Sequence, residues 1–191
     1  MHYLLRDGLR VLVVTTESTV KEYLSMMRSI KLDSYSYYLD GRLKIYPLHV
    51  EGGKWSRFLS SLFFRVTMGF LELKKSLYDA VIIDSISVLA SDTPQHEFLT
   101  FITRMKNLVA DDKSIILTFH PKFLDENSIM KLRASSDIYL VISNAKFAGL
   151  PVKVLKIVKL WGTSGERKGS VTLEINPHMG LRVLPIGGVK I

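Results

Sequence analysis

The chain has 191 residues, 47% of them hydrophobic and 23% charged, which is enough to bury one core, so we expect a single domain over residues 1–191. The absence of cysteine excludes disulfides, thiolate zinc sites and cysteine nucleophiles, and the five histidines include no pair at metal-ligand spacing. Charged residues interrupt every apolar run before the roughly 18 residues of a membrane span, and the first residues lack a secretory-signal pattern, so we expect a cytoplasmic protein.

The net charge of +8 is concentrated in the C-terminal third of the chain. From Arg133 onward there are nine Lys or Arg residues and three Asp or Glu residues, which gives that part a charge of +6. Such an excess suits an acidic partner, whether nucleotide phosphate, nucleic acid or anionic lipid. A solvated basic face without a specific partner is the alternative.

The first elements predicted along the chain are a helix, a strand and a second helix. Residues 1–5 indicate the end of a helix, and an apolar strand follows at residues 10–16. Thr19 and Glu22 have the spacing of a capping box for a helix that reaches about Ile30. Domain termini usually lie outside regular elements, so we expect part of the architecture to precede the first helix.

An edge strand and a long apolar helix come next. Residues 33–38 predict a tyrosine-rich loop, and residues 42–50 alternate like a strand that Pro47 confines to an edge or an end. A helix is expected from Trp55 to about Lys75. Burial against the sheet is favoured over a partner-facing or membrane-facing patch for its apolar residues, which are Phe58, Leu62, Phe63, Val66, Phe70 and Leu73.

The most informative stretch is YDAVIIDS, from Tyr78 to Ser85. Its central residues are uncharged and mostly β-branched, which is typical of a strand buried on both faces in a parallel sheet. The strand ends in a lone carboxylate, Asp84, at the position where open α/β sheets bind ligands. In nucleotide-dependent phosphate chemistry an aspartate at this position holds Mg²⁺, directly or through water. The alternative is a cap, because Asp and Ser also begin helices and turns.

The remaining chain continues the alternation of helices and strands and then changes character. The continued elements are a helix that begins near Pro94 and ends at Asp111, a buried strand at residues 114–120, a short helix at 124–133 and a strand at 137–142. Three further strands without helices between them are predicted at 152–161, 170–176 and 181–185. The expected fold is therefore α/β, with a mostly parallel sheet flanked by helices over residues 1–145 and an antiparallel meander over 150–186.

Polar side chains follow three of the predicted parallel strands, and they are Thr16 with Glu17, Asp84 with Ser85, and Thr118 with His120. The carboxyl ends of parallel strands lie at one edge of a sheet, so these groups are expected to converge. A glutamate near a metal-holding aspartate can orient or activate a water, and a threonine or histidine can sense or stabilise a phosphate. The alternatives are a helix N-terminal charge for Glu17 and a hydrogen-bonded histidine before proline for His120.

Five segments occur in a fixed order over nearly the whole chain: RVLVVTTES, GRLKIYPLHV, YDAVIIDSISVLA, SIILTFHP and the stretch from VKVLKIVKLWG to RVLPI. In this order they are similar to the KaiC-like, RecA-fold ATPases, and among these to the accessory motor proteins of the archaellum. The resemblance implies that the chain takes ATP and Mg²⁺. It implies a Walker B role for Asp84 beside Ser85, a catalytic glutamate at Glu17, and sensor roles for Thr118 and His120. Lys159 has the position of a lysine that reaches the nucleotide of a neighbouring subunit in hexameric rings.

Two features depart from the pattern of this family. The chain contains no G-x-x-x-x-G-K-[ST], and the family's phosphate loop, which supplies most of the grip on phosphate, would lie just upstream of Met1. In KaiC-like rings an arginine often stands two residues after the lysine, whereas this chain has Trp161. An indole cannot stabilise developing phosphate charge as a guanidinium does, which argues against hydrolysis activated by a neighbouring subunit.

The absent phosphate-loop strand also has a structural consequence. In RecA-like sheets it lies between the strands predicted here at residues 114–120 and 137–142, so each of these is expected to expose an unpaired edge. Three explanations are open: a start codon assigned too late, a fragment, or a paralogue that closes the gap differently. The first two are favoured over the third, because Met1 falls inside an element.

The expected function is that of an ATP-binding regulatory or assembly subunit of the archaellum motor, with weak or no hydrolysis and impaired nucleotide binding in these 191 residues. The implied partners are the motor ATPase, membrane platform or ring proteins, and further copies in a homo-oligomer such as a hexamer, at the inner face of the membrane. Two alternatives are a RecA-type nucleic-acid-binding paralogue and a KaiC-like autoregulatory ATPase or kinase. The basic third lacks interleaved aromatic residues, which disfavours nucleic acid, and no phosphorylatable tail follows Pro185.

Overall fold

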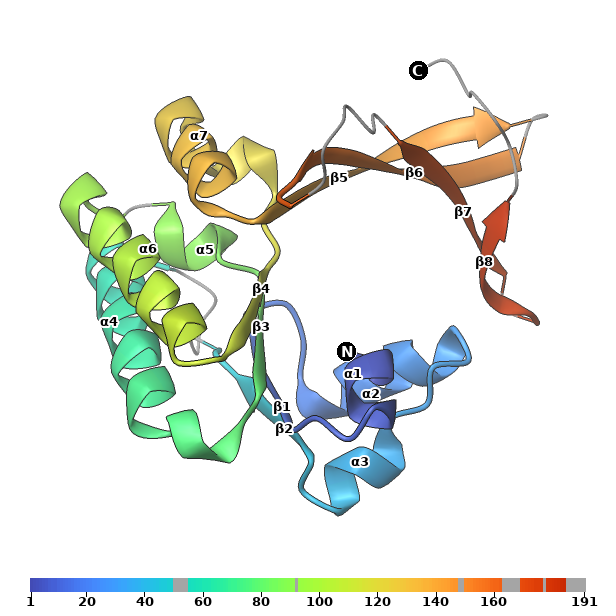
Figure 1. Cartoon of the computed structure of the whole chain (residues 1–191), viewed down its shortest axis with the longest axis horizontal. Helices are drawn as coiled ribbons and strands as arrows, with labels where there is room; N and C mark the ends of the chain where they lie inside the picture. The colour runs from blue at the N-terminus through green and yellow to red at the C-terminus, as the bar shows by residue number, and fades with distance from the viewer. Residues whose placement is uncertain (50–54, 92, 148–149, 163–168, 177, 185–191) are drawn as a thin grey trace.

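Two four-stranded sheets organise the protein (Figure 1). The computed structural model describes residues 1–49, 55–91, 93–147, 150–162, 169–176 and 178–184. The first sheet is parallel and has the strand order β2-β1-β3-β4, and the second is antiparallel and has the order β5-β6-β7-β8. The predicted combination of a parallel sheet with a C-terminal antiparallel meander is confirmed.

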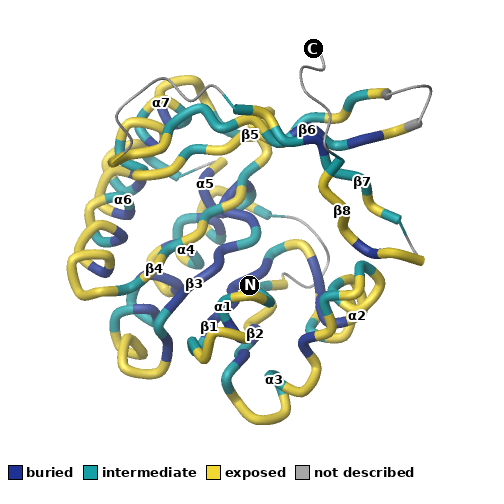
Figure 2. The backbone as a smooth tube through the Cα atoms, turned by 45° about the vertical axis from the view of Figure 1, so that its right-hand side comes forward, coloured by how far each residue is buried: buried dark blue, intermediate teal, exposed yellow. Residues whose placement is uncertain are grey.

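The parallel sheet is built from short apolar runs; its strands are β1 (Val11–Thr15), β2 (Leu43–Pro47), β3 (Ala80–Asp84) and β4 (Ser114–Leu117). β1 and β3 lie at its centre and are almost completely buried, as Figure 2 shows. Their register places Thr15 opposite Asp84, so both strands end at the same level. β2 lies at an edge, as Pro47 at its end predicts.

Helices cover both faces of this sheet (Figure 1). One layer contains α1 (His2–Arg6), α2 (Val20–Ser29) and α3 (Tyr35–Leu39), and the other contains α4 (Arg57–Leu73), α5 (Ser87–Ala90) and α6 (Gln95–Ala110). Alternate residues of β1 point into different cores, because side chains alternate across a strand. Leu12 and Val14 pack with the α4–α6 layer, and Val11 and Val13 pack with the α1–α3 layer.

Local sequence signals set several helix ends. Thr19 accepts a hydrogen bond from the backbone of Glu22 at 3.3 Å, and the Glu22 carboxylate accepts one from the Thr19 backbone at 2.8 Å, so the predicted capping box is confirmed. The prediction of a loop at residues 33–38 is wrong, because α3 begins at Tyr35. Its start is fixed by Asp33, whose carboxylate accepts a hydrogen bond from the Tyr35 N–H at 3.0 Å.

The long helix α4 buries a different face from the predicted one. Ser60, Phe64, Thr67, Met68 and Leu71 are buried against the sheet and α6. Four members of the predicted buried set are exposed instead, namely Phe58, Leu62, Val66 and Leu73. Both faces of α4 are apolar, so helical periodicity alone could not identify the buried one.

The antiparallel sheet contains β5 (Ile138–Phe147), β6 (Leu150–Leu160), β7 (Ser170–Asn176) and β8 (Gly180–Leu184). β5 extends beyond the predicted strand, because the polar segment after Ile142 continues its antiparallel pairing with β6. The turn between β7 and β8 reaches the end of α2. A Cβ atom at Gly180 would lie 2.5 Å from the Ile30 carbonyl oxygen and 3.0 Å from the Lys31 Cβ.

Each sheet has an unpaired edge at the strand that is nearest in sequence to the other sheet. β4 ends the parallel sheet and β5 ends the antiparallel sheet, so in the described residues each pairs with a strand on one side only. The predicted burial of β4 is therefore wrong: its residues alternate between exposed and half-buried.

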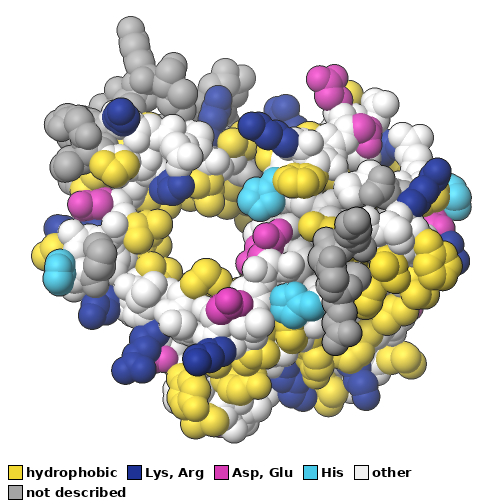
Figure 3. All heavy atoms as spheres, turned by 180° about the vertical axis from the view of Figure 1, so that it is seen from behind, with side chains coloured by type: hydrophobic (Ala, Val, Ile, Leu, Met, Phe, Trp, Pro, Cys, Tyr) yellow, Lys and Arg dark blue, Asp and Glu magenta, His cyan; other side chains and the backbone are white. Residues whose placement is uncertain are grey.

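An opening passes through the molecule, bordered by hydrophobic and acidic side chains (Figure 3). In the part of the chain that the structure describes, no helix is both long and apolar enough to cross a membrane.

Candidate nucleotide site at the carboxyl edge of the parallel sheet

The parallel register brings three strand ends together. The Thr16 N–H donates to the Asp84 carbonyl at 3.0 Å, which joins the segment after β1 to the end of β3. The Ile86 N–H donates to the Thr118 carbonyl at 3.0 Å, which joins the segments after β3 and β4. These backbone bonds continue the sheet ladder by one step beyond the strands. The expected convergence of polar groups at one edge therefore rests on regular parallel pairing.

Asp84 is oriented by the neighbouring strand end. The Thr118 hydroxyl donates to Oδ1 of Asp84 at 2.6 Å, so one carboxylate oxygen is fixed by a strong hydrogen bond. The Asp84 side chain is half-buried and points from the last residue of β3. Tyr23 of α2 lies within its electrostatic reach: burial first, and the negative charge of Asp84 second, raise the pKa of Tyr23 to about 12. The phenol is therefore neutral at physiological pH.

Glu17, Ser85 and His120 form a second group beside Asp84. The Ser85 hydroxyl donates to Oε1 of Glu17 at 2.7 Å, and His120 Nε2 lies 3.9 Å from the same oxygen. Ser85 is buried, with 1% of its surface exposed, whereas the Glu17 and His120 side chains remain 43% and 63% exposed. The buried Ser85 thus holds the Glu17 carboxylate in place by a hydrogen bond. The Glu17 carboxylate and the His120 imidazole both stay accessible to a ligand.

Two hydroxyl residues support this arrangement: Thr16, which was expected at this edge, and Ser87, which was not. The Thr16 hydroxyl donates to the Ser85 carbonyl at 3.1 Å and accepts from the Ser85 N–H at 3.3 Å. The Ser87 hydroxyl accepts from the His120 N–H at 2.8 Å and so fixes the backbone after β4. The peptide bond between Asp84 and Ser85 is cis. The sequence signal for Ser87 is the D-S-I-S pattern, in which a second serine follows Ser85 at the start of α5.

The donor set fits a metal ion that arrives with a nucleotide. Among the described residues, no three His, Asp or Glu side chains are grouped closely enough to hold a metal by themselves. Mg²⁺ usually keeps several waters and binds through one or two carboxylates together with substrate phosphates. One oriented carboxylate at Asp84, with Glu17 nearby, satisfies that requirement. In the described part of this edge, no Lys or Arg forms an ion pair with Asp84 or Glu17.

Lys159 does not join the strand-end cluster. It lies in β6 of the antiparallel sheet, and its ammonium donates to the carbonyls of Arg133 and Ala134 at 3.1 and 2.8 Å. These carbonyls belong to the last turn of α7 (Glu126–Ser135), so Lys159 caps that helix. Trp161, two residues later, has an exposed side chain, and its backbone N–H donates to the Asp137 carbonyl at 2.8 Å.

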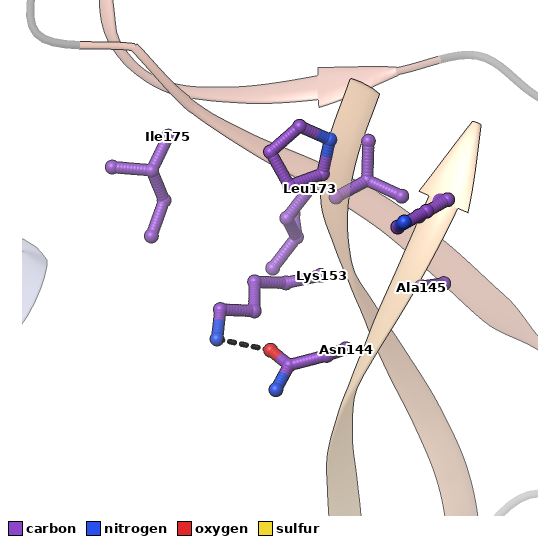
Figure 4. A pocket seen from close by; sticks show the side chains of 8 residues that line it. Asn144, Ala145, Lys153, Leu173 and Ile175 are labelled. Carbon is purple, nitrogen blue, oxygen red and sulfur yellow. Dashed lines mark hydrogen bonds between the residues drawn. The ribbon is translucent and has the colours of Figure 1, made fainter. Parts of the chain in front are cut away.

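A separate hollow lies on the antiparallel sheet (Figure 4). It has a volume of about 490 Å³, and its lining includes Asn144, Lys153, Leu173 and Ile175. The Lys153 ammonium donates to the Asn144 side-chain oxygen within it. None of the strand-end residues lines this hollow. It is open to solvent, and its Lys153 and Asn144 side chains bond each other, so the polar constellation at the parallel sheet remains the better candidate for chemistry.

Known proteins resemble this chain in sequence, although no protein-family model matches it. The archaeal flagellar ATP-binding protein FlaH of Sulfolobus acidocaldarius is 35% identical over 176 residues, which cover 91% of this chain and 75% of that protein. The chain therefore belongs to the FlaH family. FlaH of Methanocaldococcus jannaschii is 27% identical over 183 residues and is covered to 76% of its length.

The fold comparison agrees with membership of the FlaH family. The crystal structure of the flagellar accessory protein FlaH from Methanocaldococcus jannaschii matches with a TM-score of 0.80. The match covers 97% of this chain and 80% of that one, at 22% sequence identity. The predicted RecA-like α/β fold is thereby confirmed. This chain spans about three quarters of the length of its FlaH relatives.

Proposed function

We propose that this protein is an ATP-binding regulatory or assembly subunit of the archaellum motor, with Mg²⁺ and nucleotide at the carboxyl edge of the parallel sheet. The observation that carries the proposal is the strand-end cluster, in which Thr118 orients Asp84 and Ser85 orients Glu17. Membership of a family whose curated relatives are called archaeal flagellar ATP-binding proteins supports the choice of ligand and of cellular machine.

Each strand-end residue has a distinct proposed role. Asp84 would act as the Walker B carboxylate, and because Thr118 donates to its Oδ1, its other oxygen would be available to hold Mg²⁺ directly or through water. The metal would neutralise charge on the phosphate oxygens when bound. Ser85 holds Glu17 beside the space over the strand ends, where its carboxylate can orient a water molecule. His120 Nε2 lies 3.9 Å from Glu17 Oε1. The imidazole can therefore either pair with Glu17 or contact a bound phosphate.

Hydrolysis is proposed to be weak or absent, and nucleotide binding by these residues to be poor. The sequence contains no G-x-x-x-x-G-K-[ST], whose backbone amides and lysine normally supply the grip on phosphate. Trp161 stands where an arginine would stabilise the developing charge across a subunit boundary. Asp84 can therefore hold Mg²⁺ on a nucleotide only when a phosphate-binding segment beside it holds the nucleotide. In the described residues β4 and β5 each leave one edge unpaired, and we propose that such a segment pairs with these edges.

The proposed partners follow from the same family membership. They are the motor ATPase, the membrane platform or ring proteins, and further copies of this chain in a ring, with the protein held at the inner face of the membrane. In such a ring Lys159 would leave its α7 cap and reach the nucleotide of the next subunit. Lys159 is bonded only to backbone carbonyls in the described structure, so this change breaks no side-chain ion pair.

Calorimetric titration with ATP and Mg²⁺ tests the binding proposal. The 191-residue chain should bind with a dissociation constant weaker than about 0.1 mM, and micromolar binding would contradict the proposed dependence on a phosphate loop. A longer chain, with a segment that carries G-x-x-x-x-G-K-[ST] placed ahead of Met1, should bind in the micromolar range. In that longer chain Thr118→Val should weaken Mg²⁺-dependent binding by about tenfold, since Thr118 orients the metal-binding carboxylate. Thr103→Val, on the exposed face of α6, is the matched control.

A further inference from the structure

The outer face of α4 is a line of exposed apolar side chains. Phe58 and Leu73 are 74% and 84% exposed, and Leu62 and Val66 lie between them at 43% and 55%. These four residues, here called the outer stripe, recur at helical spacing along the full length of α4. Figure 3 shows a broad hydrophobic area on the side of the molecule that the α4–α6 layer forms.

The outer stripe is distinct from the core of the protein. Phe64, Met68 and Leu71 on the opposite face of α4 are already buried, so folding uses the other side of this helix. α4 therefore presents apolar side chains on its outward face as well as on its core face, although Arg65 and Glu72 also lie on this helix. Single exposed apolar residues need no explanation, but four aligned along one helix indicate a docking surface.

The acidic residues beside the outer stripe are neutralised by neighbouring guanidinium groups. Arg65 pairs with Glu97 across α4 and α6, and Arg104 pairs with Glu72. In each pair the hydrogen bond from the guanidinium lowers the pKa of the carboxyl group, so both acids stay ionised and paired. The stripe therefore carries no uncompensated negative charge in the part of α4 and α6 that the structure describes.

The ends of the outer stripe carry positive charge instead. Arg57 opens α4 and Lys74 follows its last residue, and neither forms an ion pair with any described residue. A second copy of the chain is a poor occupant for this surface. In an antiparallel pairing of two α4 helices Arg57 would face Lys74 of the other copy, and in a parallel pairing each cation would face its own equivalent. Like charges at both ends oppose either arrangement.

An anionic lipid surface matches both features of the stripe. We propose that α4 docks on such a surface, with Phe58, Leu62, Val66 and Leu73 entering the interfacial region and Arg57 and Lys74 contacting lipid headgroups. Amphipathic helices bind membranes in this way, through buried apolar side chains and attraction of cations to anionic lipids. The proposal names the surface that would hold the protein beside a membrane, and it rests on the membrane location given under the proposed function. It involves no residue of the nucleotide site.

Vesicle flotation without nucleotide tests this proposal separately from the proposed nucleotide binding. The probes are vesicles of phosphatidylcholine alone and of phosphatidylcholine mixed equally with phosphatidylglycerol. The protein should float with the anionic vesicles, and added salt should weaken the association. The double variant Phe58→Ser/Leu73→Ser should bind at least about tenfold less, because the two substitutions remove several buried CH₂ equivalents. Met130→Ser/Val183→Ser changes two comparably exposed apolar residues elsewhere and should bind like the wild type.

One further double variant tests the role of the two cations. Arg57→Gln/Lys74→Gln should bind less tightly and with a weaker salt dependence, since it removes the cations at both ends of the outer stripe. Unchanged circular dichroism melts would show that these surface variants fold. Equal flotation of wild type and the Phe58→Ser/Leu73→Ser variant, or no flotation of the wild type, would overturn the proposal. Stripe-dependent dimerisation in sedimentation, without flotation, would assign the surface to a second copy and also overturn it.

Discussion

Arg10 and Asp79 join the starts of the two central strands and give the protein a predictable dependence on pH. The Arg10 backbone N–H and Nε donate to Oδ2 of Asp79 at 2.8 and 3.0 Å, and Nη2 donates to Oδ1 at 2.7 Å. The Arg10 carbonyl accepts from the backbone N–H groups of Asp79 and Ala80. The hydrogen bonds from Arg10, side chain first, lower the pKa of Asp79 from 3.8 to about 2.

The expected magnitude follows from that shift. A pKa lowered by somewhat less than two units corresponds to about 2 kcal/mol, at roughly 1.4 kcal/mol for each unit. The Asp79 side chain is 31% exposed, so solvent screening reduces the expected contribution to about 1–2 kcal/mol. Because the folded-state pKa is the lower one, this contribution is fully present above the unfolded-state pKa near 4. It is lost as the pH falls towards 2.

Urea unfolding of the wild type and of Asp79→Asn tests this explanation at several pH values. At pH 7 the variant should lose about 1–2 kcal/mol of unfolding free energy, and the difference should shrink towards zero as the pH falls from 4 to 2. Asp7→Asn, at a more exposed and longer ion pair with Arg6, is the control and should change stability by less than about 0.5 kcal/mol. A difference between wild type and Asp79→Asn that stays constant from pH 7 to pH 2 would show that the ion pair is not its source.

Three further substitutions test local features of the fold by thermal or urea denaturation. Gly180→Ala should destabilise by about 1–3 kcal/mol, because Gly180 has φ +79° and a Cβ there meets the Ile30 carbonyl; unchanged stability would refute that contact. Thr19→Ala should cost about 1 kcal/mol by removing the cap that pairs with Glu22, and Thr19→Ser should restore most of it. Phe64→Ala should cost about 3–5 kcal/mol, and a loss below 1 kcal/mol would argue against its burial between α4 and α6.

Much of the candidate site could be predicted because it depends on strand ends rather than on distant contacts. The apolar run before Asp84 predicts a buried parallel strand, and parallel strands end together whatever their order. Glu17 and Thr118 could therefore be expected near Asp84, because each follows or ends a predicted parallel strand at its carboxyl end. The position of Lys159 could not, because its carbonyl partners at the end of α7 lie 25 and 26 residues away in sequence.

Surface and edge features were harder to predict, since periodicity does not show which face meets the core. Phe58 and Phe64 both fit helical stripes on α4, and only the packing against α6 shows that Phe64 is buried and Phe58 exposed. Ile116 lies in an apolar strand typical of a sheet centre, yet β4 ends its sheet and Ile116 is exposed. The short helix at Tyr35 begins where the Tyr35 N–H donates to the Asp33 carboxylate, a signal that also fits a turn.

Nucleotide binding at the carboxyl edge of the parallel sheet can be located by NMR of the amide groups during titration with ATP and Mg²⁺. This measurement detects weak binding and also shows which residues it affects. We expect the largest shifts at Thr16, Glu17, Ser85 and Thr118, and we expect them to diminish in Asp84→Asn. Shifts confined to the hollow around Lys153 on the antiparallel sheet, or unchanged shifts in Asp84→Asn, would contradict binding at this edge.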